Sequence, residues 1–315
     1  MWKKKNVAVA TDGGTATISQ KLHNDEERKT PRMGGIVVWG STLLTVILFK
    51  LGSYLDGATL DKLNFLSRNQ TWLTLFTLLV GAGIGLIDDY WVSRERYDQK
   101  AGGLSFWKRI AGVAIVGIIG AWWFYFKLDI SYIYVPFVGG VNIGLFFLPF
   151  FVLVMLGTYS GGVIDGLDGL SGGVFAIIFG AYGSIALLQN QNDLATFCFV
   201  LVGSLLAFLW FNIPPAKFFM SETGIMALTM TLSVVAFLTG QVLLLPIIAF
   251  PLVISSGSSS LQLLSKKYRG KKIFLVAPLH HHFQAKGTPA SSVVMRYWIT
   301  GVIVAILGLV IALLG

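Results

Sequence analysis

The chain has 315 residues, of which 55% are hydrophobic and only 12% are charged, and its mean hydropathy is +0.72. Because a soluble domain usually carries about 25% charged residues, this composition excludes an ordinary soluble globular domain. The long continuous apolar runs exclude a β-barrel, which is built from short alternating segments, and predict an all-α polytopic membrane protein. The single cysteine, Cys198, excludes an internal disulfide.

The N-terminal residues 1–32 are polar and basic, and no long apolar region follows the first lysines as it would in a cleavable signal peptide. We expect this segment to be a polar cytoplasmic tail and residues 33–315 to form a single transmembrane domain. A helix needs roughly 20 apolar residues to cross a bilayer. The apolar runs predict about nine spans, near residues 33–50, 69–87, 110–126, 143–160, 170–190, 194–212, 223–238, 241–263 and 294–315.

One stretch between spans has a different pattern. The segment SYIYVPFVGGVNIG at 131–144 is rich in aromatic and β-branched residues and contains Pro136 and the pair Gly139–Gly140. This pattern predicts a short periplasmic hairpin outside the membrane instead of a helix.

The basic residues are distributed unevenly between the two sides of these spans. Of the 24 lysines and arginines, all but Lys50, Lys62, Arg68 and Lys127 fall on the side of the N-terminus. The positive-inside rule makes that side cytoplasmic. The net charge of +9 therefore follows largely from topology and requires no nucleic-acid partner. Cytoplasmic basic groups also suit anionic lipid or phosphate.

Acidic residues stand directly against the apolar spans at their cytoplasmic ends: Asp88, Asp89, Asp165, Asp168 and Glu222. Charge at a membrane boundary is costly unless it is paired, solvated or bound to a cation. Asp88 and Asp89 could simply stop a span, but adjacent carboxylates repel one another and suit a cation or a proton transfer. On a helix Asp165 and Asp168 would share one face, and the glycines around them would let backbone approach a ligand or pack helices closely. Glu222 could instead cap the helix that follows it.

Three of the four histidines, His280, His281 and His282, are consecutive in PLHHHFQ. Consecutive side chains point in different directions and no cysteine joins them, so a structural zinc site is disfavoured. The basic stretch 266–272 precedes them, and this combination suits a polyphosphate, to which imidazoles can donate hydrogen bonds. Together with the carboxylates, it indicates a cytoplasmic cleft for magnesium-assisted phosphoryl transfer, with a lipid as one substrate.

Several motifs match a known family in order and spacing. They are KTPRMGG (29–35), GLIDDYW (85–91), GGLSFWKR (102–109), DGLDGL (165–170), FNIPPAKFFM (211–220), IFLVAPLHHHF (273–283) and VVMRYWI (293–299). From about residue 29 to its end, the chain resembles the polyprenyl-phosphate N-acetylhexosamine-1-phosphate transferases. PLHHHF is the most specific of the motifs and is similar to the branch that uses muramoyl-pentapeptide.

This resemblance implies that the phosphate of undecaprenyl phosphate attacks the sugar-linked phosphate of UDP-MurNAc-pentapeptide, so that UMP leaves and lipid I forms, with Mg²⁺ as cofactor. It implies a bacterial cytoplasmic membrane protein with its active site facing the cytoplasm, and a homodimer. The residues that it implies are catalytic Asp88, Asp89, Glu222 and His281, with Asp89 and Glu222 on the metal, and substrate-binding Lys29, Lys108, Arg109, Asp165, Asp168, Asn212, Phe219, His280 and His282.

The chain departs from the family pattern at several positions. Glu222 stands where the family has a magnesium-binding Asp in a Gly-Asp-x-Gly-Ser context, and Ser221 stands in place of that first Gly. Tyr159 and Gly162 replace two asparagines, Arg32 replaces a Thr, and Gln284 replaces a Glu; the family also has ten spans. Two alternatives stay open on these grounds: a transferase that uses another UDP-N-acetylhexosamine, and an inactive homologue that binds nucleotide or lipid. A transporter is disfavoured, because the polar clusters lie at helix ends and not at mid-membrane depth.

Overall fold

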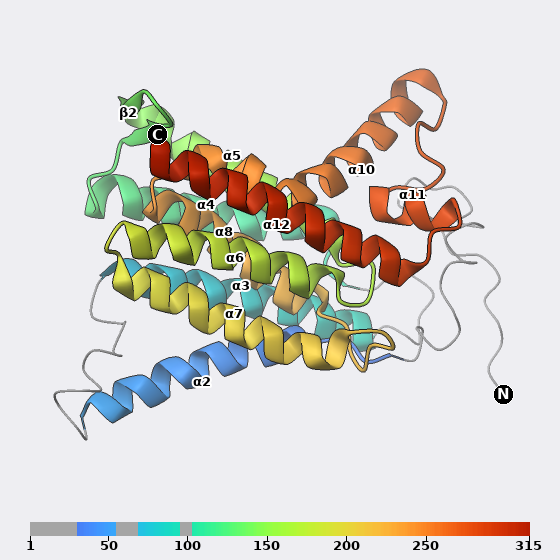
Figure 1. Ribbon diagram of the computed structural model, residues 1–315, viewed down its shortest axis with the longest axis horizontal. Coiled ribbons are helices and arrows are strands. Elements are labelled where there is room, and N and C mark those ends of the chain that lie inside the picture. Colours follow the sequence, from blue (N-terminus) through green and yellow to red (C-terminus); the bar gives the residue numbers. More distant parts are fainter. Residues whose placement is uncertain (1–29, 55–68, 95–102) are drawn as a thin grey trace.

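The computed structural model describes residues 30–54, 69–94 and 103–315 (Figure 1). Within these ranges, eight segments are long and apolar enough to cross a membrane, which confirms an all-α polytopic membrane protein. They contain α2 (Gly35–Ser53), α3 (Asn69–Arg94), α4 (Phe106–Lys127), α5 (Phe147–Ser160), α6 (Leu170–Leu188), α7 (Asn192–Asn212), α8 (Ser221–Leu238) and α12 (Ala290–Leu314). Single 3₁₀ turns, η4 (Gly144–Phe146) and η5 (Gly161–Ile164), flank α5.

The span predicted over 241–263 is broken. The 3₁₀ turn η6 (Val242–Leu244) and α9 (Leu245–Ile248) meet α10 (Phe250–Arg269) at an angle of 80°, and the pair brings the number of spans to nine if it is counted as one. Pro251 lies in the first turn of α10 and has no N–H to continue the hydrogen bonding of α9, so the chain bends at Ala249. In Figure 1, α10 consequently points away from the bundle and carries the chain to α11 (Leu279–Ala285).

The predicted hairpin is present. Strand β1 (Tyr132–Val135) pairs antiparallel with β2 (Gly139–Asn142), with Tyr132 opposite Asn142. The Tyr134 hydroxyl donates a 2.6 Å hydrogen bond to the carbonyl of Gly315, so the hairpin lies against the end of α12. Figure 1 shows this end of the molecule opposite the end that carries α11.

Helix α8 is the centre of the fold. All residues from Thr223 to Leu238 are buried, and α3 packs along it. Small residues permit this close approach: a Cβ on Gly81 would lie 2.8 Å from the carbonyl oxygen of Met226. The first turn of α8 is thereby held against the last turns of α3, which extends beyond its predicted range to Arg94.

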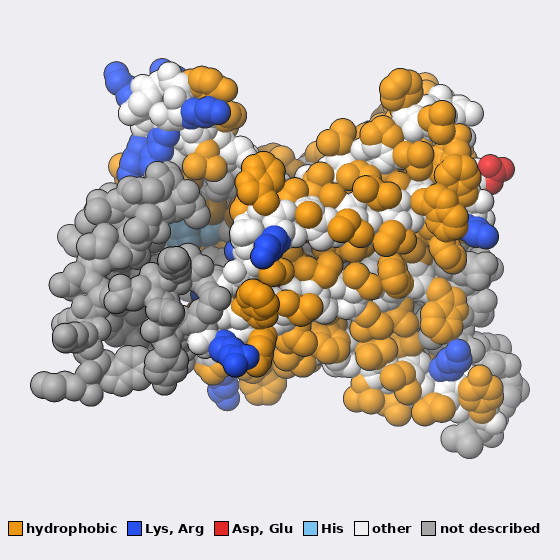
Figure 2. All heavy atoms as spheres, turned by 180° about the vertical axis from the view of Figure 1, so that it is seen from behind, with side chains coloured by type: hydrophobic (Ala, Val, Ile, Leu, Met, Phe, Trp, Pro, Cys, Tyr) orange, Lys and Arg blue, Asp and Glu red, His pale blue; other side chains and the backbone are white. Residues whose placement is uncertain are grey.

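On the face shown in Figure 2, the described part of the helix bundle is mostly apolar, as expected for helices that face lipid. Lysine and arginine side chains gather at the free end of α10, where the chain continues through Lys266, Lys267, Arg269, Lys271 and Lys272. The multi-pass membrane architecture therefore ends, on the side of α11, in a basic segment.

Candidate active site

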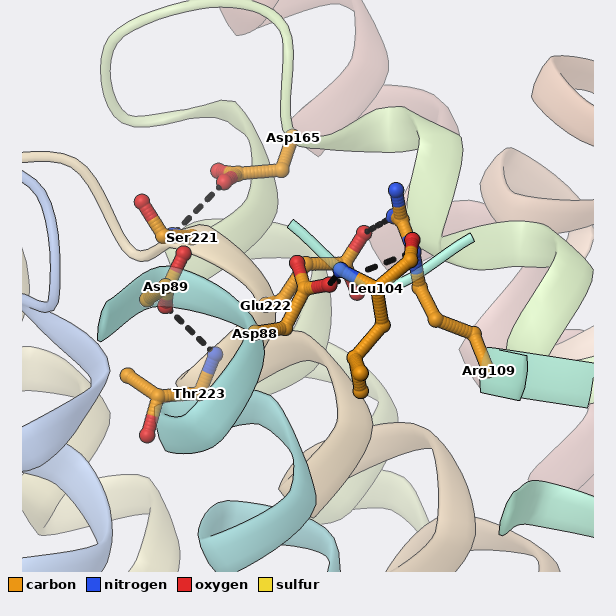
Figure 3. A network of polar contacts seen from close by, with 8 residues as sticks. All are labelled: Asp88, Asp89, Leu104, Arg109, Asp165, Ser221, Glu222 and Thr223. Carbon is orange, nitrogen blue, oxygen red and sulfur yellow. Dashed lines mark hydrogen bonds and ion pairs between the residues drawn. The ribbon is translucent and has the colours of Figure 1, made fainter. Parts of the chain in front are cut away.

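Three carboxylates from two helices meet at this end of the bundle (Figure 3). Asp88 and Asp89 lie inside α3 and each is only 1% exposed, whereas Glu222 lies in the first turn of α8. An Asp89 carboxylate oxygen accepts a 2.9 Å hydrogen bond from the N–H of Thr223, and Asp88 accepts one of 2.6 Å from the N–H of Leu104. Thus Asp88 and Asp89 do more than end a helix, because their carboxylates fasten α3 to α8 and to the segment before α4.

Arg109, which reaches the site from α4, is the cation of this cluster. Its Nη1 lies 2.7 Å from Oε1 of Glu222, and its Nε lies 3.5 Å from Oδ1 of Asp88 and 3.1 Å from the carbonyl oxygen of Leu104. The guanidinium therefore offsets part of the negative charge of two acids at once. Tyr159 from α5 is a further hydrogen-bonding neighbour of Arg109. Lys108 is exposed, and of these two adjacent basic residues only Arg109 has a described ion pair with the carboxylates.

Two carboxylate oxygens of the cluster lack a hydrogen-bond donor among the described residues. Oδ1 of Asp89 and Oε2 of Glu222 are buried and have no hydrogen-bond partner in the described part of the chain. A buried anionic oxygen without a donor is costly, and a hard cation would satisfy it. These residues fit magnesium, which commonly uses one or two carboxylates together with substrate phosphates. No group of three or more His, Cys, Asp or Glu suited to a metal occurs among the described residues, so the remaining ligands would come from substrate or water.

The DGLDGL segment, residues 165–170, is mainly a turn and not a helix. Asp165 follows η5 and precedes α6, and its oxygens accept hydrogen bonds from the Ser171 hydroxyl (2.7 Å) and the N–H of Ser221 (3.0 Å). Asp168 instead accepts a 3.0 Å bond from the N–H of Ala216. The sequence argument for one shared helical face is therefore wrong, because the chain turns at Gly169, which has a positive φ of 79°. Burial raises the pKa of the Asp165 carboxyl, and the two hydrogen bonds and the charge of Arg32 oppose this rise.

Asn212 and Phe219 lie on the segment that closes this side of the site. The Asn212 amide is buried; its oxygen accepts from the N–H of Gly169 (2.9 Å) and its nitrogen donates to the carbonyl of Phe218 (2.8 Å). Phe219 is half-buried, and its carbonyl accepts from the N–H of Gly34. Both polar ends of Asn212 are thus used within the protein, so we expect it to position the DGLDGL turn. Lys29 lies outside the described residues.

Two of the three histidines, His280 and His281, face the same turn and only His282 points elsewhere, so the expectation that all three diverge is wrong for this pair. His280 is fully buried against His281 and Tyr297, and neither of its ring nitrogens has a hydrogen-bond partner among the described residues. A Cβ on Gly166 would lie 2.6 Å from Nε2 of His280 and 2.8 Å from Nε2 of His281, so both imidazoles face the DGLDGL turn. His282 turns away, and its Nδ1 accepts a 3.2 Å hydrogen bond from the N–H of Leu275.

The buried His280 predicts a specific pH dependence of stability. Burial, and secondly the neighbouring His281, lower the pKa of His280 well below its ordinary value. The unfolded chain binds a proton below about pH 6.5 that the folded chain does not, so stability should fall as the pH is lowered from about 7.5 to about 5. Thermal unfolding of the detergent-solubilised protein should show this loss, and His280→Asn should reduce it. His282→Asn is the comparison, because the pKa of this half-buried imidazole is also lowered, by burial and by Lys286, but less than that of His280; it should reduce the loss less than His280→Asn does. Equal pH dependence in His280→Asn and the wild type would contradict the assignment.

Ser221, next to the candidate metal ligand, has a strained backbone. Its φ of 58° lies in the left-handed region, which costs a residue with a Cβ roughly 1–2 kcal/mol. In this conformation the N–H of Ser221 donates a hydrogen bond to the Asp165 carboxylate, which offsets part of the strain. Sequence reasoning identified this position only as a departure from Gly, and it missed the backbone donors of Ser221, Thr223 and Leu104, because main-chain groups leave no residue signature.

Ser221→Gly is therefore expected to stabilise the fold. Glycine adopts positive φ without steric cost but gains entropy in the unfolded chain, so the net gain in the free energy of unfolding should be at most ~1 kcal/mol. Ser160→Gly is the matched control, because Ser160 has a helical φ of −59° and glycine should destabilise it. Thermal unfolding of both variants would check the pair; a loss of stability in Ser221→Gly equal to that in Ser160→Gly would contradict the strain.

Comparison with known proteins agrees with this arrangement. The sequence profile of glycosyl transferase family 4 matches residues 71–240, which include Asp88, Asp89, Asp165 and Glu222. A phospho-N-acetylmuramoyl-pentapeptide-transferase of Pelagibacter ubique is 32% identical over 96% of this chain and 83% of its own length. Proteins of the same name are 35% identical in Levilactobacillus brevis, over 90% of this chain and 85% of their own length, and 36% identical in Chloroflexus aurantiacus, over 90% and 77%.

The chain belongs to glycosyl transferase family 4. Within the family it groups with the phospho-N-acetylmuramoyl-pentapeptide-transferases, which confirms the resemblance drawn from its motifs. It is therefore a multi-pass membrane protein of a transferase family. The family relationship assigns no role to an individual side chain, so the roles of the residues above stay predictions.

Proposed function

We propose that this protein transfers phospho-MurNAc-pentapeptide from UDP-MurNAc-pentapeptide to undecaprenyl phosphate, at the cytoplasmic face of the bacterial inner membrane. The names of its relatives supply the transferred group. The observation that carries the proposal is the meeting of Asp88, Asp89 and Glu222 with Arg109 at the ends of three spans. An acidic cluster with a fixed arginine beside a lipid phase suits a reaction between a soluble diphosphate and a lipid phosphate.

In this reaction, an oxygen of the lipid phosphate forms a bond to the sugar-linked phosphorus of the nucleotide. The bond from that phosphorus to the bridging oxygen breaks, and UMP leaves with the electron pair. The product is a lipid-linked diphosphate sugar, lipid I. Because no water takes part, a site at the membrane surface that admits both phosphates in line is sufficient.

The protein's own residues would divide the work as follows. Asp88 and Asp89 orient the lipid phosphate and take up any proton that it carries, because hydrogen bonds from Leu104 and Thr223 fix their carboxylates. Arg109 contributes a positive charge beside the reacting phosphates. Magnesium, held by Oδ1 of Asp89 and Oε2 of Glu222, would supply charge neutralisation of the diphosphate.

The nucleotide would lie on the side of the DGLDGL turn. Asp165, Asp168 and Asn212 hold this turn against residues 213–221, and His280 and His281 back it from α11. Phe219 is the candidate for stacking on the uracil, and Lys29 and Lys108 are candidates for contact with the substrate. His281 would act on the diphosphate; its Nδ1 is fixed at 2.8 Å from Oε1 of Gln284, which leaves Nε2 toward the turn.

The test is turnover by the purified chain in detergent. UMP release is measured with undecaprenyl phosphate and UDP-MurNAc-pentapeptide, with and without Mg²⁺, and lipid I is identified by mass. Magnesium-dependent release of both products is expected. Faster turnover of another UDP-N-acetylhexosamine in direct competition would move the assignment to a related transferase, and binding of UDP-MurNAc-pentapeptide without any turnover would indicate an inactive homologue. The proposed homodimer is checked separately by the mass of the protein–detergent complex.

A further inference from the structure

A basic pocket lies between α11 and the segment that joins it to α10. It is an open pocket of about 390 Å³, lined by Lys272, Ile273, Phe274, Leu275, His282 and Lys286. All of these residues lie outside the candidate membrane spans, in the α10–α11 segment, in α11 and, for Lys286, directly after α11. The pocket therefore opens beyond the ends of the helices, where a soluble ligand can enter it.

The walls of this pocket are held by a buried glutamine. Oε1 of Gln262 accepts hydrogen bonds from the N–H groups of Ile273 (2.9 Å) and Phe274 (3.0 Å), and its Nε2 donates to the carbonyl of Phe274 (2.9 Å). The His282 ring packs edge-on against Phe274, with ring centroids 5.5 Å apart. The segment between α10 and α11 is thus fixed in place, which lowers the entropy lost when a ligand binds.

The side-chain nitrogens with which this pocket can bind a ligand are donors. Nδ1 of His282 accepts from the N–H of Leu275, so in the neutral imidazole the proton is on Nε2, which can donate to a ligand. Lys272 and Lys286 are exposed, and neither forms an ion pair with a described residue. Two ammonium groups and one imidazole donor, without an acidic partner in the described part of the chain, suit an anion, and the apolar walls suit an organic one.

The pocket also adjoins the candidate active site. His281, the residue before His282, faces Gly166 of the DGLDGL turn, whereas His282 contacts Phe274 and Leu275 of the pocket wall. A ligand that reaches from that turn past α11 would arrive at the basic pocket. The group carried by the relatives' substrate is a pentapeptide attached to a sugar, and a peptide ends in a carboxylate.

We propose that this pocket, lined by Lys272, His282 and Lys286, binds the carboxylates of the peptide of the sugar-nucleotide substrate. The inference rests on the proposed function and extends it, because it assigns recognition of the peptide to residues separate from those that act on the diphosphate. In this proposal α11 separates two binding regions: His280 and His281 support the turn at the diphosphate, and His282 belongs to the pocket that binds the peptide.

The test is direct binding, by calorimetry, to the full chain in detergent without lipid substrate. The probes are UDP-MurNAc-pentapeptide, the same compound with its peptide carboxylates amidated, and UMP. The wild type should bind the acidic substrate about tenfold more tightly than the amidated one, which corresponds to about 1.4 kcal/mol. In Lys272→Gln/Lys286→Gln this preference should disappear, with UMP binding unchanged.

Lys267→Gln/Lys271→Gln is the matched control, because it removes the same charge from the same basic segment without touching the pocket lining. The proposal is overturned if this control loses as much acidic-substrate binding as the pocket variant. It is also overturned if the pocket variant loses as much UMP binding as acidic-substrate binding. Either result would mean that the lysines attract anions only through their overall charge. So would a pocket variant that keeps its preference but loses binding to phosphatidylglycerol vesicles, which would make the pocket a membrane contact. Wild-type protein that binds the acidic substrate no better than UMP and shows no turnover would count against the proposed function itself.

Discussion

Glu222→Gln should lower kcat/KM for UMP release by at least about a hundredfold. The substitution keeps the length of the side chain but removes its negative charge. In the wild type this charge pairs with Arg109 at 2.7 Å, and Oε2 of the same carboxylate is available for a cation. The dependence of the rate on Mg²⁺ concentration should also shift to higher concentrations. Steady-state UMP release over a magnesium titration measures both effects.

Two further variants provide a control and a conservative substitution for this prediction. Asp129→Asn removes a carboxylate from an exposed position at the other end of the bundle and should leave turnover unchanged. Glu222→Asp restores the residue type that the family pattern has at this position, but it withdraws the carboxylate from Arg109 by one methylene. We expect it to be about tenfold slower than the wild type, because small displacements at a reacting centre are costly. Wild-type rates in Glu222→Gln would show that Glu222 neither binds the metal nor supports the reaction.

Gly85→Ala should disrupt the site from inside the bundle. A Cβ on Gly85 would overlap the backbone carbonyl of Glu222, which cannot move without moving the first turn of α8. Overpacking of this kind typically costs about 1–3 kcal/mol, and separation of α3 from α8 would also break the bond between Asp89 and the N–H of Thr223. We therefore expect a lower thermal midpoint and at least a tenfold loss of turnover.

The same helix supplies the matched control for this prediction. Gly83 stands two residues earlier, and a Cβ there would meet no atom within 4 Å. Gly83→Ala should leave turnover intact and should raise helix stability slightly, since alanine is the better helix former. Thermal unfolding and UMP release of the two variants, measured side by side, distinguish a steric clash at the α3–α8 contact from a general effect of alanine substitution in α3. Equal behaviour of the two would show that α3 and α8 do not approach as described.

The sequence by itself determined the class of fold, because the apolar runs must bury their backbone polar groups as helices in lipid. It also located the hairpin at 131–144 and nearly all the residues that gather at the candidate site. Charged groups such as Asp88 and Glu222 are recognisable beside apolar spans because burying them requires a compensating partner. The motifs then identified the family.

Only the tertiary structure decided how these groups are used. It showed that Arg109, and not the adjacent Lys108, pairs with Glu222, and that Asp165 and Asp168 bind two different segments. It also bent the chain by 80° at Ala249, within a run that reads as one span. Contacts between residues more than 100 positions apart, and main-chain donors such as the N–H of Thr223, depend on how helices pack. Packing is set by the whole set of interfaces, so no local pattern of residues encodes it.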